Sequence, residues 1–335
     1  MPLTIEDLRR AGLAPNAILH SYQTREEWAA ARTRGLGGSD IAAIVGLSPW
    51  AGPWDVFAAK TSGLQTKPES LRMRLGTALE PFLCAEYERE HSRTPIPNTA
   101  LFQSGRHPWQ VGTPDAFLDP LLGLEWKTTD SRNASQWGDE EDAVPDYYAA
   151  QVAWYGMICD IPEWHLSVLI GNNDFRTYRL TRDPDLEDAL LDAGARFWRD
   201  HIKTGRPPAI QAGDVDAAAR WIQNRFASHR TPLRKATEEE ELLLCQLRNI
   251  RKDLAQLEKD EALLETRLKA LLEEAEGIEG PGFRLTWKKT KDSTRTDWEA
   301  VVKHLPRTEQ LDRLIRGATR TVPGSRRFLP KWEAE

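Results

Sequence analysis

Two acidic residues and a lysine lie close together in the middle of the sequence, in a pattern that can do chemistry. Asp115 follows Pro114, and Glu125 and Lys127 are two positions apart. Residues two apart on a strand project from the same face of the sheet. The mostly apolar segment between Asp115 and Glu125 can fold back as a hairpin. Both acids and the lysine would then share one pocket.

This group suits the metal-assisted hydrolysis of phosphodiesters. Mg²⁺ binds carboxylate oxygens, keeps several waters and takes phosphate oxygens as further ligands. A metal-bound water becomes a hydroxide-like nucleophile. A nearby lysine can orient or deprotonate that water, or stabilise the negative charge that develops on the phosphate. A solvated salt bridge on an edge strand fits the same residues equally well, so both interpretations stay open at this point.

Two further polar residues occur in apolar helical segments. The spacing predicts a helix over residues 71–90, and we expect Glu80 on its inner face. Gln151 lies in a second apolar helix, which follows Pro145. A charge at a core-facing position costs several kcal/mol unless it is paired or binds a ligand. Together with the hairpin, Glu80 and Gln151 therefore indicate one site.

The elements around these residues alternate between helix and strand. We expect a helix over residues 24–32 with Thr24 as its N-cap, and another that starts near residue 38 with Ser39 as its N-cap. Short strands are expected near residue 102 and over residues 109–112, 115–118, 121–127, 163–170 and 175–180. A helix over about residues 184–204 completes this part. The order predicts an α/β or α+β fold, with a small mixed central sheet flanked by helices.

Three segments are expected along the chain: a first domain over residues 1–210, a helical extension over residues 211–280 and a basic segment over residues 281–335. Leucine and isoleucine recur at alternating steps of four and three in residues 243–271, which predicts a long helix. This helix either packs against its own domain or pairs as a coiled coil or helical hairpin. Similarly, the basic segment is either a solvated surface or a patch that faces DNA or a partner.

Composition excludes several classes of protein. The chain has 335 residues and a formal net charge of −6. No apolar run approaches the ~20 residues of a membrane-spanning helix. Its three cysteines are far apart, and we expect no secretory signal and a cytoplasmic location. Residues 1–210 hold 21 basic and 29 acidic side chains, whereas residues 281–332 hold 13 basic and 5 acidic ones. The charge therefore excludes only a uniformly basic DNA-binding protein.

The motifs together resemble a known group of enzymes. Glu80, Pro114-Asp115, Glu125-Trp126-Lys127 and Gln151 occur in the order of the PD-(D/E)xK nuclease superfamily. The N-terminal residues Trp28, Arg32 and Ser39 are similar to those of its YqaJ viral-recombinase group, which includes phage lambda exonuclease. The resemblance covers about residues 28–208. Trp126 is bulkier than usual in that strand and Ala116 replaces a common glycine, but neither change removes a ligand.

The resemblance implies a Mg²⁺-dependent 5′→3′ exonuclease that digests linear double-stranded DNA and leaves 3′ single strands. Asp115, Glu125 and the backbone carbonyl of Trp126 would bind metal, and Glu80 would serve a second ion. Mn²⁺ could replace Mg²⁺. Lys127 and Gln151 would position the attacking water, and Tyr148 would line the site. Arg32 and Ser39 would hold the terminal 5′-phosphate, since arginine binds phosphate with two parallel donors.

The resemblance also implies partners. These are double-stranded DNA ends, a single-strand annealing protein and further copies of the chain in a ring-shaped trimer, with no membrane. Two other functions stay open: a sequence- or structure-specific DNA endonuclease of the same superfamily, and a non-enzymatic DNA-binding scaffold. Trp137 lies in a polar segment that could contact DNA, although packing is the simpler interpretation.

Overall fold

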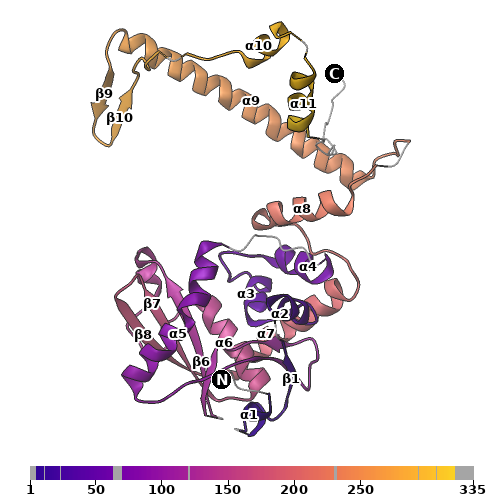
Figure 1. Ribbon diagram of the computed structural model, residues 1–335, viewed down its shortest axis with the longest axis vertical. Coiled ribbons are helices and arrows are strands. Elements are labelled where there is room, and N and C mark those ends of the chain that lie inside the picture. Colours follow the sequence, from indigo (N-terminus) through magenta and orange to yellow (C-terminus); the bar gives the residue numbers. More distant parts are fainter. Residues whose placement is uncertain are drawn as a thin grey trace. The chain divides into compact units, whose positions relative to one another are not determined.

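The computed structural model describes residues 5–10, 12–22, 24–62, 70–119, 121–229, 232–292, 294–306 and 308–320. It separates into two units, residues 1–227 and residues 228–335, and each is described by itself. Figure 1 shows the mixed strands and helices of the first unit and the long helix of the second. The part of the basic tail beyond residue 320 lies outside the described residues.

A five-stranded sheet is the centre of the first unit. Its strands lie in the order β2 (Ile96–Pro97), β5 (Ala116–Asp119), β6 (Leu122–Thr129), β7 (Glu163–Ile170) and β8 (Asp174–Thr181). Only β6 and β7 run parallel, and the other neighbours are antiparallel. A second sheet joins β1 (Ala17–Ser21), β3 (Ala100–Ser104) and β4 (Val111–Gly112). The expected mixed sheet is confirmed.

Helices cover both faces of the five-stranded sheet, as Figure 1 shows. On one side α6 (Asp146–Cys159) connects β6 to β7 and packs against α3 (Gly38–Ile44) and α7 (Pro184–Phe197). On the other side lies α5 (Leu71–His91), which contacts β6. When helices cover both faces of a sheet, the side chains on both faces of its central strands are buried. Accordingly, the first five residues of β6 are all buried.

The two faces of β6 have different chemistry. Leu124 and Trp126 pack with Leu83 and Tyr87 of α5. Side chains alternate between the faces of a strand. Glu125 and Lys127 therefore point to the other face, toward α6. The alternation that buries Leu124 and Trp126 thus also positions the two charged groups.

The predicted inner face of α5 is only partly correct. Leu83 and Tyr87 are buried, but Leu75 and Phe82 are 53% and 51% exposed. Glu80 is also exposed. The expectation that Glu80 faces the core is wrong, because the helix packs on β6 through a narrower stripe than the apolar pattern suggests.

The helix starts show which capping expectations hold. Thr24 caps α2 (Arg25–Arg32) as expected, and its hydroxyl accepts the Glu27 N–H at 3.2 Å. Ser39 is not the N-cap of α3, which is a correction. Gly37 is the N-cap, and its own N–H donates to the Asp40 carboxylate at 2.7 Å. Ser39 therefore stands inside the first turn.

The first unit continues past the predicted boundary at residue 210. Helix α8 (Val215–Arg225) buries Ala217 and Ala218. Its Trp221 ring lies 5.6 Å from that of Trp54, which belongs to α4 (Pro53–Ser62). This aromatic contact keeps α8 with the first unit. A short helix α1 (Ile5–Arg10) precedes β1.

The second unit contains one long helix, α9 (Glu238–Leu272), as the leucine spacing predicts. Thr237 caps it, and the Thr237 N–H donates to the Glu240 carboxylate at 2.9 Å. The leucine stripe is exposed, up to 83% at Leu271. A hairpin and two short helices follow: β9 (Gly277–Gly280), β10 (Phe283–Thr286), α10 (Trp298–His304) and α11 (Glu309–Ala318). No helix among the described residues is both long and apolar enough to cross a membrane.

One close contact in the sheet yields a stability prediction. Gly123 of β6 stands beside Trp164 of β7, and a Cβ on Gly123 would lie 2.4 Å from the indole ring. Trp164 is almost fully buried and cannot move aside freely. Gly123→Ala should therefore lower the free energy of unfolding by about 1–3 kcal/mol, as overpacking does elsewhere. Urea denaturation measures this loss.

Two controls distinguish overpacking from a general intolerance of alanine. A Cβ on Gly213 would point into open space, with no other side chain within 4 Å. Gly213→Ala should therefore change the unfolding free energy by no more than about 0.5 kcal/mol. In a Trp164→Leu background, Gly123→Ala should cost less, because the ring is gone. An equal cost in both backgrounds would contradict the explanation.

Candidate active site

The β5–β6 hairpin brings Asp115 and Glu125 together as the sequence predicts. Ala116 pairs with Leu124, so Asp115, one residue earlier, lies opposite Glu125. Asp115 Oδ2 accepts the backbone N–H of Trp126 at 2.7 Å. This bond holds the Asp115 carboxylate at the open end of the hairpin, away from the loop that joins β5 to β6. The Pro114-Asp115 and Glu125-Trp126-Lys127 motifs thus lie on neighbouring strands.

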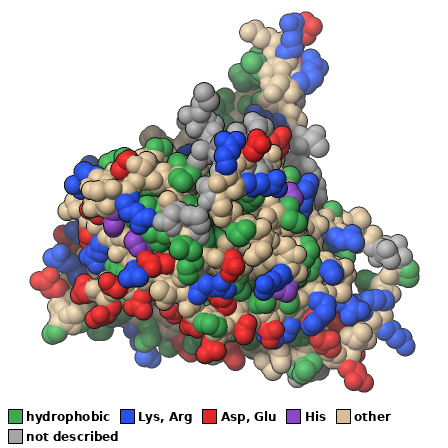
Figure 2. Space-filling view, turned by 90° about the horizontal axis from the view of Figure 1, so that it is seen from below, with side chains coloured by type: hydrophobic (Ala, Val, Ile, Leu, Met, Phe, Trp, Pro, Cys, Tyr) green, Lys and Arg blue, Asp and Glu red, His purple; other side chains and the backbone are tan. Residues whose placement is uncertain are grey.

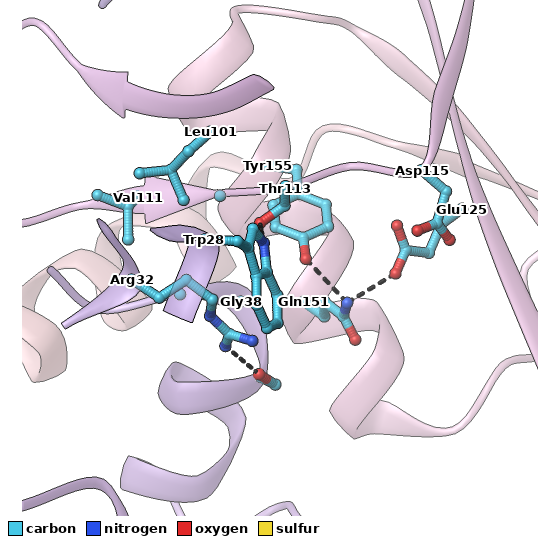
Figure 3. A pocket seen from close by; sticks show the side chains of 13 residues that line it. Trp28, Arg32, Gly38, Leu101, Val111, Thr113, Asp115, Glu125, Gln151 and Tyr155 are labelled. Atoms are coloured by element: carbon cyan, nitrogen blue, oxygen red, sulfur yellow. Dashed lines mark hydrogen bonds between the residues drawn. The ribbon is translucent and has the colours of Figure 1, made fainter. Parts of the chain in front are cut away.

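Glu125 is the most enclosed group of the site, with 2% of its surface exposed. Its Oε1 accepts Lys127 Nζ at 2.5 Å and Gln151 Nε2 at 2.7 Å. The Gln151 amide also donates to the Tyr155 hydroxyl at 3.0 Å, and Figure 3 shows the bonds of Gln151 to Glu125 and Tyr155. Glu125 Oε2 is buried and has no hydrogen-bond partner. A buried carboxylate oxygen is expensive to leave unpaired.

The charges of the site are not balanced. Burial raises the pKa of Glu125 to about 8, and the nearby Asp115 charge adds to this. Burial also raises the pKa of Asp115, although Lys127 and the Trp126 N–H oppose the shift. Burial opposes the charge of Lys127, but Glu125 and Asp115 outweigh it and raise the pKa of that ammonium. Two buried carboxylates share one lysine, which leaves room for another cation.

The residues fit a divalent metal ion. Asp115 and Glu125 supply hard oxygen donors, and the unpartnered Glu125 Oε2 is a ligand atom without a present partner. Mg²⁺ is typically bound by one or two carboxylates, with water and substrate phosphate as the other ligands. The backbone carbonyl of Trp126 belongs to the residue that directly follows Glu125 in β6. The carboxylate pair is therefore a candidate metal site.

Glu80 is not part of this pair. Among the described residues, no three His, Cys, Asp or Glu side chains gather closely enough to hold a metal together. Glu80 is separated from the carboxylate pair because it belongs to α5, which covers the opposite face of β6. Glu80 lies instead at the margin of the site, near Tyr22. Burial raises the pKa of Tyr22, and the charges of both Glu80 and Asp115 add to the shift.

Arg32 and Ser39 meet although they belong to different helices. Arg32 Nη2 donates to Ser39 Oγ at 3.0 Å. The Arg32 guanidinium also lies over the Trp28 ring, 4.9 Å from its centroid. The Trp28 indole N–H reaches Thr113 Oγ1 at 3.4 Å, which connects α2 to the loop before Asp115. The predicted anion-binding pair is thus positioned beside the acidic hairpin.

A single cavity of about 170 Å³ joins the two groups. Arg32, Ser39, Asp115, Glu125 and Gln151 all line it. Figure 3 shows the carboxylates on one side of this cavity and the Arg32 guanidinium on the other. Asp115 and Glu125, which are expected to bind metal, therefore share one space with Arg32 and Ser39, whereas Glu80 and Trp126 do not line it.

Lys127 and Tyr148 do not line this cavity, which corrects the expectation for Tyr148; Lys127 reaches it only through Glu125. Lys127 Nζ is 5.0 Å from the centre of the Tyr148 ring, a cation–π contact. Burial raises the pKa of the Tyr148 hydroxyl, so this group stays neutral at ordinary pH. Trp137 is buried against the rings of Tyr148 and Tyr178. The simpler interpretation of Trp137, as a packing residue, is confirmed.

Sequence reasoning missed four residues near the cavity. Tyr155 lies one helical turn after Gln151, and this i, i+4 spacing could have revealed it. Gly38 allows close approach, because a Cβ there would lie 2.8 Å from Gln151 Cγ. Asp40 and Lys60 form a buried ion pair beside Arg32. Asp40 and Lys60 lie on separate helices, so no spacing rule indicated that they meet.

A larger cavity of about 760 Å³ lies on the other side of α6. Ala149, Val152, Ala153 and Gly156 of α6 line it, whereas Gln151 and Tyr155 face the smaller cavity. Its other lining residues include Glu140, Glu141, Asp142, Asp183 and Glu187, against Arg179 and Arg182. This acidic surround does not suit DNA phosphates. The smaller cavity is therefore the candidate active site.

Two solved structures resemble the chain at low identity. An alkaline exonuclease (LHK-Exo) from Laribacter hongkongensis is 16% identical with a TM-score of 0.44, and the match covers 54% of this chain and 94% of that one. A phage related exonuclease from Haemophilus somnus 129PT is 12% identical with a TM-score of 0.38, covering 51% of this chain and 96% of that one. Neither likeness is close enough to transfer an activity.

Sequence comparison is more direct. The chain is 28% identical over 296 residues to the uncharacterized protein YqaJ of Bacillus subtilis (strain 168), which covers 86% of this chain and 90% of that protein. Residues 27–161 match the YqaJ-like viral recombinase domain. That range includes both the Arg32–Ser39 pair and the Asp115–Glu125 pair. Over residues 27–161 the chain is therefore similar to YqaJ-like viral recombinase domains.

Proposed function

We propose that this protein is a Mg²⁺-dependent nuclease that digests linear double-stranded DNA from 5′ ends and leaves 3′ single strands for recombination by strand annealing. One observation carries the proposal. A buried, incompletely paired carboxylate and an arginine–serine pair line the same cavity of about 170 Å³. A metal-binding group and an anion-binding group in one small space suit the cleavage of a phosphodiester next to a terminal phosphate.

The proposed roles follow from the contacts. Asp115, Glu125 and the Trp126 carbonyl would hold Mg²⁺, or Mn²⁺ in its place. Bound there, the metal would activate a water and stabilise negative charge on the scissile phosphate. Gln151 donates to Glu125 Oε1 at 2.7 Å, and the buried Oε2, which has no hydrogen-bond partner, would be available to a metal ion. Glu80 would contact a second ion through water.

Lys127 acts in this proposal as a cation and not as a base. Its pKa is above the ordinary range because two carboxylates face it, although burial opposes the charge. A protonated ammonium donates hydrogen bonds and cannot accept a proton. Held beside Glu125 at 2.5 Å, Nζ would position the attacking water and offset the charge that develops on the phosphate.

The cavity size supports an action at ends. A space of about 170 Å³ is large enough for a terminal phosphate and its immediate surroundings. Arg32 and Ser39 would bind this phosphate through charge-assisted hydrogen bonds. On the face shown in Figure 2, basic and acidic side chains are interspersed and do not form one large basic patch. Positive charge for DNA is therefore expected to be local.

Two partners belong to the proposal through the family resemblance alone. A ring-shaped trimer would keep the enzyme on its DNA, and a single-strand annealing protein would receive the 3′ strand. The exposed leucine stripe of α9 and the described basic residues after residue 281 are surfaces available for such contacts.

The first prediction from this function concerns the substrate. A linear duplex with a labelled 5′ end should lose its label with Mg²⁺ and stay intact in EDTA. A covalently closed circle of the same sequence should stay intact in both conditions, because it has no end. Gel electrophoresis and release of acid-soluble label measure the two outcomes. Discrete fragments from the closed circle would instead show an endonuclease, and no cleavage of any duplex would favour a DNA-binding scaffold.

The second prediction concerns Lys127. Lys127→Met keeps much of the side-chain volume but removes the charge beside Glu125. Loss of one group that stabilises developing charge typically costs about 10²–10³-fold in rate. We expect a loss in this range in single-turnover digestion, with an unchanged far-UV circular dichroism spectrum. Lys269→Met, at an exposed position of α9, is the matched control and should retain full activity. Full activity of Lys127→Met would contradict the proposed role.

The third prediction concerns stability and pH in the metal-free protein. The pKa of Glu125 is raised to about 8 from an ordinary 4.5, chiefly by burial, so the folded state holds this proton more tightly than the unfolded state. The free energy of unfolding should therefore fall as the pH rises from about 4.5 to about 8 in EDTA. Urea denaturation at several pH values measures the slope.

Glu125→Gln should flatten this slope, because the amide does not titrate. Mg²⁺ should reduce the slope in the wild type by compensating the carboxylate charge, but not in Glu125→Gln. An identical slope in the wild type and in Glu125→Gln would show that other groups cause the pH dependence.

A further inference from the structure

A buried ion pair lies directly behind Arg32. Lys60, on α4, is 4% exposed at its side chain, and its Nζ is 2.7 Å from Asp40 Oδ2. The same ammonium donates to the backbone carbonyl of Arg32 at 2.8 Å. Lys60 thus contacts both the end of helix α2 and the first turn of helix α3. It does not line the cavity.

Asp40 stands between two cations. Its Oδ2 accepts both Lys60 Nζ and the Gly37 N–H, each at 2.7 Å. Its Oδ1 is 3.9 Å from Arg32 Nη2, a distance for attraction but not for a direct hydrogen bond. The Arg32 guanidinium itself bonds Ser39 Oγ and rests on the Trp28 ring.

Stability alone does not account for this pair. Burying two charges costs desolvation, and a buried ion pair is often no more stable than apolar residues of the same volume. Burial lowers the pKa of Lys60, and the Asp40 charge opposes that shift. Burial would raise the pKa of Asp40, but Lys60 and Arg32 outweigh it and keep the pKa below its usual range. Asp40 is therefore charged and would attract Arg32.

The three charges sum to one positive charge only because Lys60 is present. Arg32 and Lys60 are cations and Asp40 is an anion. Without Lys60, the Asp40 carboxylate would neutralise the Arg32 guanidinium and could draw it from 3.9 Å into a direct ion pair. The cavity would then offer no net positive charge to an anion. Lys60 contacts Oδ2 of Asp40, so it offsets the carboxylate charge while Oδ1 faces Arg32 at 3.9 Å.

We propose that Lys60 is a positioning residue that neutralises Asp40, so that the charge of Arg32 stays available to the terminal phosphate in the cavity. The proposal rests on the proposed role of Arg32 and Ser39 in binding a 5′-phosphate. It assigns to this buried pair the preference of the protein for phosphorylated DNA ends. Lys60 touches neither the substrate nor the reacting atoms, so it acts through Arg32.

The test uses the full-length protein and short duplexes that differ only in a 5′-phosphate or a 5′-hydroxyl. Fluorescence anisotropy in EDTA gives the ratio of the two dissociation constants without cleavage. Lys60→Met should reduce this preference at least about tenfold, the loss expected for weakening one charge-assisted contact. In Mg²⁺ the KM for phosphorylated ends should rise, whereas kcat should stay within about twofold of the wild type.

Charge removal at Asp40 distinguishes this role from simple packing. Asp40→Asn keeps the shape and an oxygen acceptor for Gly37, and should retain the phosphate preference. Asp40→Asn combined with Lys60→Met removes both charges and should restore the preference that Lys60→Met loses. Lys203→Met, at an exposed position of the same unit, should behave as the wild type.

Several outcomes would overturn the proposal. Lys60→Met with an unchanged preference would do so, and so would a double variant that folds but fails to recover it. If Lys60→Met does not fold, Asp40→Asn serves as the test. A loss of the preference for a 5′-phosphate in this variant would overturn the proposal. A wild type that prefers phosphorylated ends but cleaves no DNA would overturn the proposed nuclease and leave this inference standing. A wild type with no preference for phosphorylated ends would overturn the role of Arg32 and Ser39, and this inference with it.

Discussion

Two neighbouring carboxylates that share one lysine, which bonds Glu125, are the constraint on which the rest of the first unit depends. Asp115 and Glu125 repel each other, and burial makes their charged forms costly. The hairpin register, the Trp126 N–H, Lys127 and Gln151 together keep the pair in place. A divalent cation of the kind proposed would compensate this unfavourable arrangement, which connects the stability of the site to its proposed chemistry.

The other half of the cavity also contains a charge that must be offset, but there the excess charge is positive. Arg32 must stay positive to bind a phosphate, yet Asp40 lies 3.9 Å from its guanidinium. Lys60 resolves this conflict from behind, at 2.7 Å from Asp40. A chain with a net charge of −6 thus holds two focused sites of opposite charge within one small cavity. The acidic composition does not conflict with DNA as substrate, because the charges that matter are local.

Strand alternation explains most of what could be predicted about the site. Glu125 and Lys127 share a face because they are two residues apart, and the hairpin brings Asp115 opposite because the segment between them is short and apolar. Gln151 was predicted from a polar residue in an apolar helix. Glu80 was misplaced because an apolar stripe does not show how much of a helix face the sheet covers. The Ser39 cap was also wrong, because α3 starts at Gly38 and Gly37 is its N-cap, which places Ser39 inside the first turn.

The sequence by itself determined the elements and the chemistry each could carry, because local spacing sets strand faces, helix faces and turn positions. It indicated the mixed sheet, the long helix and the acidic hairpin on these grounds. Only the tertiary structure decided which groups meet across elements. Arg32 beside Ser39 and Lys60 beside Asp40 depend on how separate helices pack. Packing angles follow from the volumes of the whole core, including its buried tryptophans, and no short stretch of sequence contains that information.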